Sequence, residues 1–395
     1  MSNSHLINYL NSNFHLGFDN QTLIDHFLNE FGVNVKIEND LYLFKYDMIQ
    51  VKWNDITKEC RGHILTVSED GWEFVSRPWD KFYNLGEGHC PITNCDNFSP
   101  FKLVQKADGT AIQMYNYNGV WRVSTLGTIT TMNVGESGLT FKDLFYKVFG
   151  DKSKQIVLDP DYTYLFELTT RYNRIVTQYE NDQIFLLGCR HNESGKYYPH
   201  NCLDSLASTI GVLQPVSFSC EEHNLIIRDR VIDFVEEQST NSRFGKNSEG
   251  FIVYDENGVP NCKIKNQKYI ALHHLCGGDP LASRNNILEL IFAGRVDDVY
   301  GDLLPEFQEY VNKVQAWVSD FWKSINECVK IVHEQKPQTR KDYALLVKGH
   351  KGSCLLFKQF DVICNGQCLN IEHFNDYLKN SWKSYEAELK NLYNS

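Results

Sequence analysis

Along roughly the first 275 residues, short apolar runs alternate with turn dipeptides, and this pattern predicts antiparallel strands. Three dipeptides that suit hairpin loops lie between such runs: Asp70-Gly71, Asn118-Gly119 and Asn257-Gly258. Asn, Asp and Gly tolerate the positive φ that these loops need, so such a dipeptide between two alternating runs is a strong hairpin signal. Strands joined in this way are antiparallel, and a doubly wound parallel sheet is therefore not expected.

Apolar residues also recur at helical spacing between the predicted hairpins, in residues 22–31, 140–149, 201–210 and 229–238. After about residue 281, helical spacing dominates. It runs through residues 307–332 and a final predicted helix over residues 371–392, with one short possible hairpin around residues 344–360. The pattern thus predicts an α+β domain built on antiparallel sheet, followed by a mostly α-helical domain.

The length of the chain supports two domains, which we expect at residues 1–280 and 281–395. A chain of 395 residues is longer than a domain with a single hydrophobic core usually is. Its composition, with 42% hydrophobic and 23% charged residues, is that of a globular protein. The N-terminus lacks the pattern of a signal peptide, and no apolar stretch is long enough to span a membrane. We therefore expect a cytoplasmic, reducing location, no membrane partner, and free thiols for the twelve cysteines.

The net charge of −11 argues against a chain that coats nucleic acid through bulk positive charge. It leaves room for a local basic cluster. Residues 336–358 form a locally basic stretch that includes Arg340, Lys341 and Lys348 against the single acidic residue Asp342. Both a solvated surface and a phosphate-binding surface remain open for this stretch.

Residues 101–110 combine an apolar run with a lysine, a carboxylate and a glycine. Lys106 and Asp108 are two residues apart, so in a strand they would share one face. Gly109 would let the backbone approach a ligand closely. A lysine in a partly desolvated pocket can lose its proton and attack an electrophile, although an ordinary strand end fits the same pattern.

Further charged residues lie inside apolar runs downstream. Glu167 is flanked by Phe166 and Leu168, and Glu249 begins another strand-like run. Such charges are costly to bury unless they are paired or coordinate a ligand. Lys263 and Lys265 alternate on one face of a predicted strand, where an anion between them, with phosphate the obvious candidate, would relieve their repulsion.

Taken in order, these segments resemble the motifs of covalent nucleotidyltransferases, most closely those of the RNA ligase 1 family of T-even phages. The resemblance covers roughly residues 55–275. Its core motifs are Lys106-x-Asp108-Gly109 for the nucleotidyl-lysine, Phe166-Glu167 with residues 173–176, Glu249-Gly250-Phe251, and Lys263-Ile264-Lys265 with Tyr269. Upstream, Arg61-Gly62 and residues 76–87, which include Lys81, resemble the stretch before the active lysine.

One position departs from the family pattern. The family usually carries a lysine in a Ser-x-Lys-Gly stretch after the nucleophile, whereas Ser124-Thr125-Leu126-Gly127 places leucine there. If the alignment holds, one contact to a phosphate or to metal-bound water is missing. ATP affinity or lysine adenylylation would then be weaker, but the nucleophile would remain.

The resemblance implies an ATP-dependent RNA ligase that forms a lysyl-AMP intermediate. AMP would pass from the lysine to a 5′-phosphate end, and a 3′-hydroxyl would then displace it. The implied catalytic residues are Lys106, Lys263 and Lys265. The implied ATP-binding residues are Arg61, Lys81, Asp108, Gly109, Glu167, Lys263 and Lys265. Mg²⁺ or Mn²⁺ would lie at Glu249.

Hairpin geometry gives a test of this site. A two-residue loop at Asn257-Gly258 would place Glu249 opposite Asn266, on the other face from Lys263 and Lys265. We therefore predict a three-residue loop with a bulge at Gly258, or an equivalent bulge near Pro260, which would place Glu249 across from Lys265.

Two alternatives stay open at this stage. DNA ligases and capping enzymes share the nucleotidyl-lysine domain, but they typically follow it with a small β-barrel. A non-catalytic RNA-binding relative would fit the leucine at position 126. For the RNA ligase, the expected partner is RNA with 5′-phosphate and 3′-hydroxyl ends, such as cleaved tRNA. Arg340, Lys341 and Lys348 are possible RNA contacts, and a separate kinase-phosphatase could prepare the ends.

Overall fold

The computed structural model describes residues 4–134, 137–150, 158–238, 241–245, 247–276 and 280–393. The chain divides into two compact units, Met1–Ile270 and Ala271–Ser395. The division falls inside helix α7 (Gln267–Cys276), somewhat before the expected position at residue 280.

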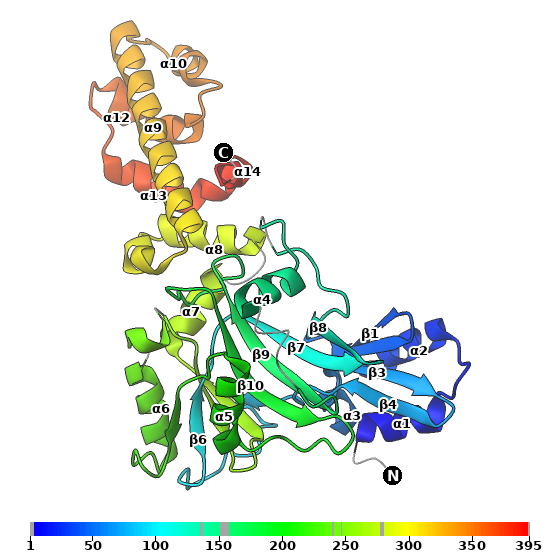
Figure 1. The fold of residues 1–395 in the computed structure, drawn as a ribbon. Coiled ribbons are helices and arrows are strands. Elements are labelled where there is room, and N and C mark those ends of the chain that lie inside the picture. Colours follow the sequence, from blue (N-terminus) through cyan, green and yellow to red (C-terminus); the bar gives the residue numbers. More distant parts are fainter. Residues whose placement is uncertain are drawn as a thin grey trace. The chain divides into compact units, whose positions relative to one another are not determined.

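The first unit contains three sheets, antiparallel except for one short strand pair (Figure 1). The N-terminal sheet has the order β1 (Val33–Glu38), β2 (Leu41–Tyr46), β3 (Arg61–Ser68), β4 (Gly71–Ser76). The central sheet has the order β10 (Gln183–His191), β9 (Tyr162–Thr169), β7 (Thr110–Tyr117), β8 (Val120–Thr125). The third sheet has the order β11 (Ser217–Ser219), β6 (Lys102–Gln105), β12 (Gly250–Tyr254), β13 (Pro260–Lys265), β5 (Tyr83–Asn84).

Two of the predicted hairpins are confirmed, the first with its turn shifted by one residue. Ser68 pairs with Gly71 between β3 and β4, so the turn holds Glu69 and Asp70 and not Asp70-Gly71. Tyr117 pairs with Val120 between β7 and β8. In that second turn Asn118 and Gly119 have φ values of 53° and 76°, the left-handed conformation that selects Asn-Gly in two-residue loops.

Four helices of the first unit lie where the periodicity predicts them: α2 (Asn20–His26) with a π-turn at Phe27–Phe31, α4 (Phe141–Phe149), α5 (Leu203–Ile210) and α6 (Arg228–Glu237). Two more, α1 (His5–Asn13) and α3 (Asp55–Lys58), were not predicted. Helix α4 begins at a capping box between Thr140 and Asp143, and its Phe145 packs edge-on against Phe166 of β9. The apolar faces of α4 and α5 pack on one side of the central sheet and leave its other side for the site.

In the second unit, every regular element that the structure describes is helical. The longer helices are α8 (Pro280–Phe292), α9 (Pro305–Gln335) and α13 (Ile371–Ser381), and the shorter ones are α10 (Arg340–Val347), α11 (Ser353–Lys358), α12 (Phe360–Cys364) and α14 (Glu386–Asn391). The hairpin expected around residues 344–360 is wrong. Val347, Leu355 and Leu356 are buried in the same core as α9, so burial at helical spacing decides this segment.

The final helix expected over residues 371–392 is interrupted. It ends at Ser381, and a 3₁₀ turn at Trp382–Tyr385 precedes α14. Trp382 is buried and stacks on Phe292 with 5.6 Å between ring centroids. The turn places this large ring in the core. None of the helices among the described residues has both the length and the apolar character to cross a membrane.

Candidate functional site

The end of strand β6 places Lys106 beside a buried carboxylate. The Lys106 backbone N–H donates to the Gly250 carbonyl at 2.9 Å, which ties this residue to the start of β12. Its Nζ lies 2.7 Å from Glu249 Oε2, and Lys265 Nζ lies 2.8 Å from Glu249 Oε1. Glu249 therefore bridges the predicted nucleophile and a lysine of β13.

This carboxylate determines the protonation of the lysine. Burial alone would lower the pKa of Lys106, but the charges of Glu249, Glu167 and Asp108 more than offset it and raise the pKa. Burial likewise opposes ionisation of Glu249, while Lys106 and Lys265 hold the pKa of its carboxyl below the ordinary value. Lys106 is thus an ammonium in this arrangement, and it must lose a proton before it can act as a nucleophile.

The hairpin between β12 and β13 confirms the predicted loop and corrects the predicted register. Asp255 and Val259 close a three-residue loop, Tyr254 pairs with Pro260, and a bulge follows directly. The bulge returns the strands to a register in which Gly250, and not Glu249, lies opposite Lys265.

Glu249 still reaches the lysines because it precedes the strand. Gly250 has φ 133°, and a Cβ there would lie 2.1 Å from the Ile264 carbonyl oxygen. This backbone conformation breaks the regular alternation of side chains along a strand. Glu249 can therefore share a site with Lys265 although the register alone would place it on the other face.

Glu167 approaches the site from the central sheet. It lies on β9, and its Oε1 accepts a hydrogen bond from the Gly109 N–H at 3.0 Å. A Cβ on Gly109 would lie 2.3 Å from the Leu168 carbonyl oxygen, so only glycine allows this approach. Burial raises the pKa of Glu167 to about 8, with Lys106 opposing the shift. The sheet thus presents a carboxyl group that can exchange hydrogen bonds with a polar ligand.

Asp108 is fully engaged with the protein. Its Oδ2 accepts hydrogen bonds from the backbone N–H groups of Val176 and Thr177 at 2.9 and 2.7 Å, and its Oδ1 accepts one from the Tyr269 hydroxyl at 2.8 Å. Its own N–H donates to the Tyr179 hydroxyl at 2.8 Å. These bonds fix the backbone directly after Lys106, the predicted nucleophile. Its assignment to ATP binding stays a prediction.

Three more of the predicted cations gather around the same place. Burial, and then the charges of Lys81, Lys106, Lys265 and Arg61, lower the pKa of Lys263 to about 7. Lys81 Nζ lies 5.0–5.4 Å from the ring centroids of Tyr46, Trp53 and Tyr83. Like charges held together in a part-buried place are unfavourable without a counter-charge. The cluster therefore suits an anion with several charges.

A pocket opens between the central and third sheets at these residues. It is lined by the predicted residues Arg61, Lys106, Gly109 and Glu167 together with Trp79, Phe82, Ile252 and Tyr254, among others. The Arg61 guanidinium lies 4.6 Å from the Phe82 ring centroid. Apolar and aromatic walls with a few polar groups are typical of a small-molecule site. The sequence had not indicated a role for the aromatic residues of this pocket.

A network that no sequence pattern indicated supports the Pro78–Lys81 backbone. Arg190 of β10 donates to both oxygens of Asp80 at 2.9 and 2.8 Å and to the Pro78 carbonyl at 2.7 Å. His63 Nε2 lies 3.4 Å from Asp80 Oδ1. The network holds Trp79 and Lys81 in place. Asp80 belongs to a matched motif, but no local signal pointed to Arg190, more than 100 residues away.

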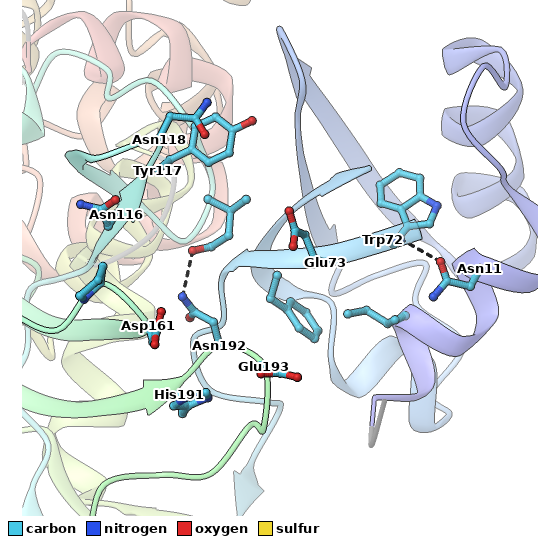
Figure 2. A pocket seen from close by; sticks show the side chains of 14 residues that line it. Asn11, Trp72, Glu73, Asn116, Tyr117, Asn118, Asp161, His191, Asn192 and Glu193 are labelled. Atoms are coloured by element: carbon cyan, nitrogen blue, oxygen red, sulfur yellow. Dashed lines mark hydrogen bonds between the residues drawn. The ribbon is translucent and has the colours of Figure 1, made fainter. Parts of the chain in front are cut away.

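A larger pocket lies elsewhere in the first unit and contains none of the predicted residues (Figure 2). Its lining includes Glu73, Asp161 and Glu193, with several asparagines around them. Trp72 donates its backbone N–H to Asn11 Oδ1 at 2.9 Å at one side. Three carboxylates make this pocket unsuitable for a polyphosphate.

The donors at Glu249 suit a divalent ion that arrives with a phosphate ligand. The described residues form no group of three or more His, Cys, Asp or Glu side chains that could hold a metal by themselves. Mg²⁺ is commonly bound through one or two carboxylates plus substrate phosphates. Glu249, with Glu167 nearby, meets that need.

In the second unit, the candidate RNA contacts lie on the exposed surface of α10. Arg340 and Lys341 occupy its first turn and Lys348 caps its C-terminal end. Arg340 lies 4.8 Å from the Phe360 ring centroid, while Lys351 is engaged with Glu388 at 2.6 Å. Lys341 and Lys348 project from the same short helix without such a contact among the described residues.

The part of the chain that holds these site residues is similar to known proteins. A family model described as RNA ligase (RNA_lig_T4_1) matches residues 59–269, more than half of the chain. The RNA ligase of Rhodothermus phage RM378 is 27% identical, and the match covers 90% of this chain and 92% of the phage protein. A putative bifunctional polynucleotide kinase/RNA ligase of Autographa californica nuclear polyhedrosis virus is 29% identical over 70% of this chain, which spans 39% of the viral protein.

Solved structures with a similar arrangement include an archaeal ATP-dependent RNA ligase (form 1). It is 14% identical with a TM-score of 0.45, and the match covers 93% of this chain and 87% of the archaeal one. A putative ATP-dependent DNA ligase from Aquifex aeolicus is 12% identical with a TM-score of 0.43, over 84% and 89% of the two chains.

Proposed function

The chain belongs to the RNA ligase family whose model it matches, and we propose that it uses ATP to join RNA 5′-phosphate and 3′-hydroxyl ends. The observation that carries this proposal is the position of Lys106. It ends a strand at a pocket, contacts a buried carboxylate at 2.7 Å, and faces a cluster of cations. We propose the first unit as the adenylyltransferase domain and the second as a domain for RNA specificity.

In the first step, neutral Lys106 Nζ attacks the α-phosphorus of ATP. A nitrogen–phosphorus bond forms, the bond from that phosphorus to the bridging oxygen breaks, and pyrophosphate leaves. Arg61, Lys81, Lys263 and Lys265 stabilise the charge that builds up on the phosphates. Glu167 and Gly109, on the central sheet, are suited to hold the nucleoside.

Lys106 must release a proton before this step, and its carboxylate neighbours hold that proton in place. A divalent ion, Mg²⁺ or Mn²⁺, at Glu249 and the ATP phosphates would supply positive charge that lowers the pKa of the lysine. Lys265 would then remain to contact phosphate oxygens.

In the second step, a 5′-phosphate oxygen of RNA attacks the phosphorus of lysyl-AMP and the Lys106 nitrogen leaves. In the third, a 3′-hydroxyl attacks the 5′-phosphorus, a new phosphodiester forms, and AMP leaves as the proton of the hydroxyl is lost. Each transfer occurs at a phosphorus flanked by the same cations. One pocket can therefore serve all three steps.

The test is covalent labelling with ATP that carries ³²P at the α-phosphate. The wild-type chain is expected to take up label, and Lys106→Ala to take up none because the nucleophile is removed. Lys102→Ala, at the start of the same strand, is the matched control and should label normally. Label that persists on Lys106→Ala would contradict the proposal. Sealing of single-stranded RNA ends in preference to nicked duplex would then separate an RNA ligase from a DNA ligase.

We further propose that the RNA is structured, as in a cleaved tRNA, and that Arg340, Lys341 and Lys348 contact its phosphates. A helix N-terminus with two exposed basic residues suits a phosphate. The relative from Autographa californica nuclear polyhedrosis virus is named as a putative polynucleotide kinase as well as an RNA ligase, and this chain spans only 39% of that protein. We therefore propose that a separate kinase-phosphatase prepares the ends. The described cysteine side chains are free thiols, which favours a reducing, cytoplasmic location.

A further inference from the structure

We propose that Lys45 of β2 binds the β- and γ-phosphates of ATP and stabilises the leaving pyrophosphate. It would supply the positive charge that Leu126 does not. The inference rests on the proposed function, because it assumes that ATP is the ligand of the pocket. It assigns a role to a strand of the N-terminal sheet that lies outside the matched motifs.

Lys45 is the direct neighbour of a residue that lines the ATP pocket. Phe44 of β2 pairs with His63 of β3, and the next pair joins Lys45 to Arg61, so Gly62 is left over as a bulge. Directly paired residues of antiparallel strands project from the same face. Because Arg61 lines the pocket, Lys45 lies one strand further along the same surface.

The loop that contains Leu126 lies against this pair. Gln113 Nε2 donates to the carbonyls of Gly62 at 3.0 Å and Thr125 at 3.1 Å, and so ties the loop to the bulge. A Cβ on Gly62 would lie 2.5 Å from the Leu126 carbonyl oxygen. A Cβ on Gly127 would lie 2.8 Å from Lys45 Nζ. The ammonium of Lys45 is therefore in contact with the loop at the position next to Leu126.

The cations around this loop have no counter-charge in the described part of the chain. Lys36 Nζ donates to the Gly127 carbonyl at 2.8 Å. Lys45 shows neither an ion pair nor a hydrogen bond among the described residues. Burial, and then the charges of Lys36 and Arg61, lower its pKa. An anion placed between Lys45 and Arg61 would relieve this repulsion, and phosphate fits two such donors.

The order of the cations indicates which phosphates Lys45 reaches. Lys106 and Lys265 contact Glu249 and mark the α-phosphorus. Lys263 is close enough to both of them and to Arg61 for their charges to affect its pKa. Arg61 lines the pocket together with Lys106 and pairs directly with Lys45 on the neighbouring strand, whereas Lys106 and Lys265 both contact Glu249. Lys45 thus lies at the end of the series away from the nucleophile, where the β- and γ-phosphates would lie.

This position predicts that Lys45 acts in the first step alone. Transfer of AMP from ATP to Lys106 releases pyrophosphate, whereas sealing of RNA that already carries AMP at its 5′ end does not. We expect Lys45→Ala to slow labelling of Lys106 about tenfold at low ATP concentration. Sealing of pre-adenylylated RNA should remain at the wild-type rate. A variant that is merely misfolded would lose both reactions.

The matched control is Lys52→Ala, since Lys52 is an exposed lysine of the same region whose Nζ contacts the Asn29 carbonyl at 3.0 Å. It should behave as wild type in both assays. Lys45→Ala with Leu126→Lys should recover a large part of the labelling rate. No recovery would overturn the link to position 126.

Three further outcomes would overturn the inference in distinguishable ways. Normal labelling by Lys45→Ala would refute the role of Lys45 while the proposed function stands. Equal loss of labelling and of sealing of pre-adenylylated RNA would do the same in a variant that thermal unfolding shows to be folded. A wild-type chain that takes up no label from α-labelled ATP would refute the proposed function and this inference together.

Discussion

Neighbouring charges act in opposite directions on two lysines of the site, although burial lowers the pKa of both. Carboxylates more than offset burial at Lys106 and raise its pKa, whereas cations add to the effect of burial at Lys263 and lower its pKa to about 7. Burial raises the pKa of Glu167 to about 8. The two lysines of this site therefore differ in charge near neutral pH, and of the two Lys263 is the one poised to gain a proton when an anion binds.

This difference predicts proton uptake on nucleotide binding. Above pH 7, Lys263 is mostly neutral in the free protein, and a bound phosphate would raise its pKa and protonate it. At pH 6 it is already protonated, so little uptake by this residue is expected. Binding of α,β-methylene-ATP, measured by calorimetry in buffers of different ionisation enthalpy, should show up to one proton more at pH 8 than at pH 6.

Lys263→Arg is the control for this experiment, because arginine stays charged throughout this range. The variant should bind the analogue, and the extra uptake at pH 8 should disappear. Equal uptake by the variant and the wild type would show that another group titrates and would contradict the assignment to Lys263.

Among the elements, the β12–β13 hairpin decides whether the site forms. A Cβ at Gly250 would lie 2.1 Å from the Ile264 carbonyl oxygen, and φ there is 133°. We expect Gly250→Ala to destabilise the fold by roughly 1–3 kcal/mol through strain and to move Glu249 away from Lys106 and Lys265. Labelling of Lys106 should fall steeply even at temperatures where thermal unfolding shows the variant to be folded.

Gly119→Ala is the control that separates the two effects of Gly250→Ala, backbone strain and displacement of Glu249. Gly119 also has a positive φ, 76°, but a Cβ there would meet no atom within 4 Å. We expect a loss of about 1 kcal/mol with labelling unchanged. If both alanine variants label alike, the hairpin geometry does not control the position of Glu249.

The turn and the bulge of this hairpin could be predicted from the sequence, but the register of its two strands could not. Asn257-Gly258 indicated the turn, and the need to bring Glu249 to Lys265 indicated a bulge. The register was wrong because the bulge and the conformation of Gly250 compensate for one another at opposite ends of the strand pair. A pattern of alternating residues cannot show that, since it assumes a regular strand from end to end.

In the whole molecule, the least predictable contacts join distant segments. The motif residues Lys106, Glu167, Glu249 and Lys263 could be proposed from sequence because each lies in a short recognisable run. Arg190 and Lys45 lie in no such run, and only the packing of sheets brings Arg190 to Asp80 and Lys45 to Gly127. Similarly, burial of Leu355 and Leu356 beside α9, a tertiary effect, turned an expected hairpin into helix.

The second unit carries the last prediction, which concerns the RNA that the molecule selects. The short helix α10, about 12 Å long, exposes three basic residues: Arg340, Lys341 and Lys348. They can contact phosphates only close to this helix. Such residues add little for a short oligonucleotide bound at the pocket and more for a structured RNA with phosphates elsewhere. Replacing all three by alanine should weaken sealing of a cleaved tRNA several-fold, with short oligonucleotides sealed normally. The loss should be larger at low salt, because salt screens the wild-type contacts to phosphate.

The matched control replaces Lys323 and Lys330 of α9 and Lys379 of α13 by alanine, which removes the same number of charges from exposed positions elsewhere in the unit. This variant should seal both substrates as wild type does, because a contact to RNA depends on position and bulk charge does not. A change with neither substrate in the triple variant would mean that the basic stretch is a solvated surface. Equal losses with both substrates would indicate instead that α10 acts on the end-joining reaction itself, since the oligonucleotide offers no distant phosphates to lose.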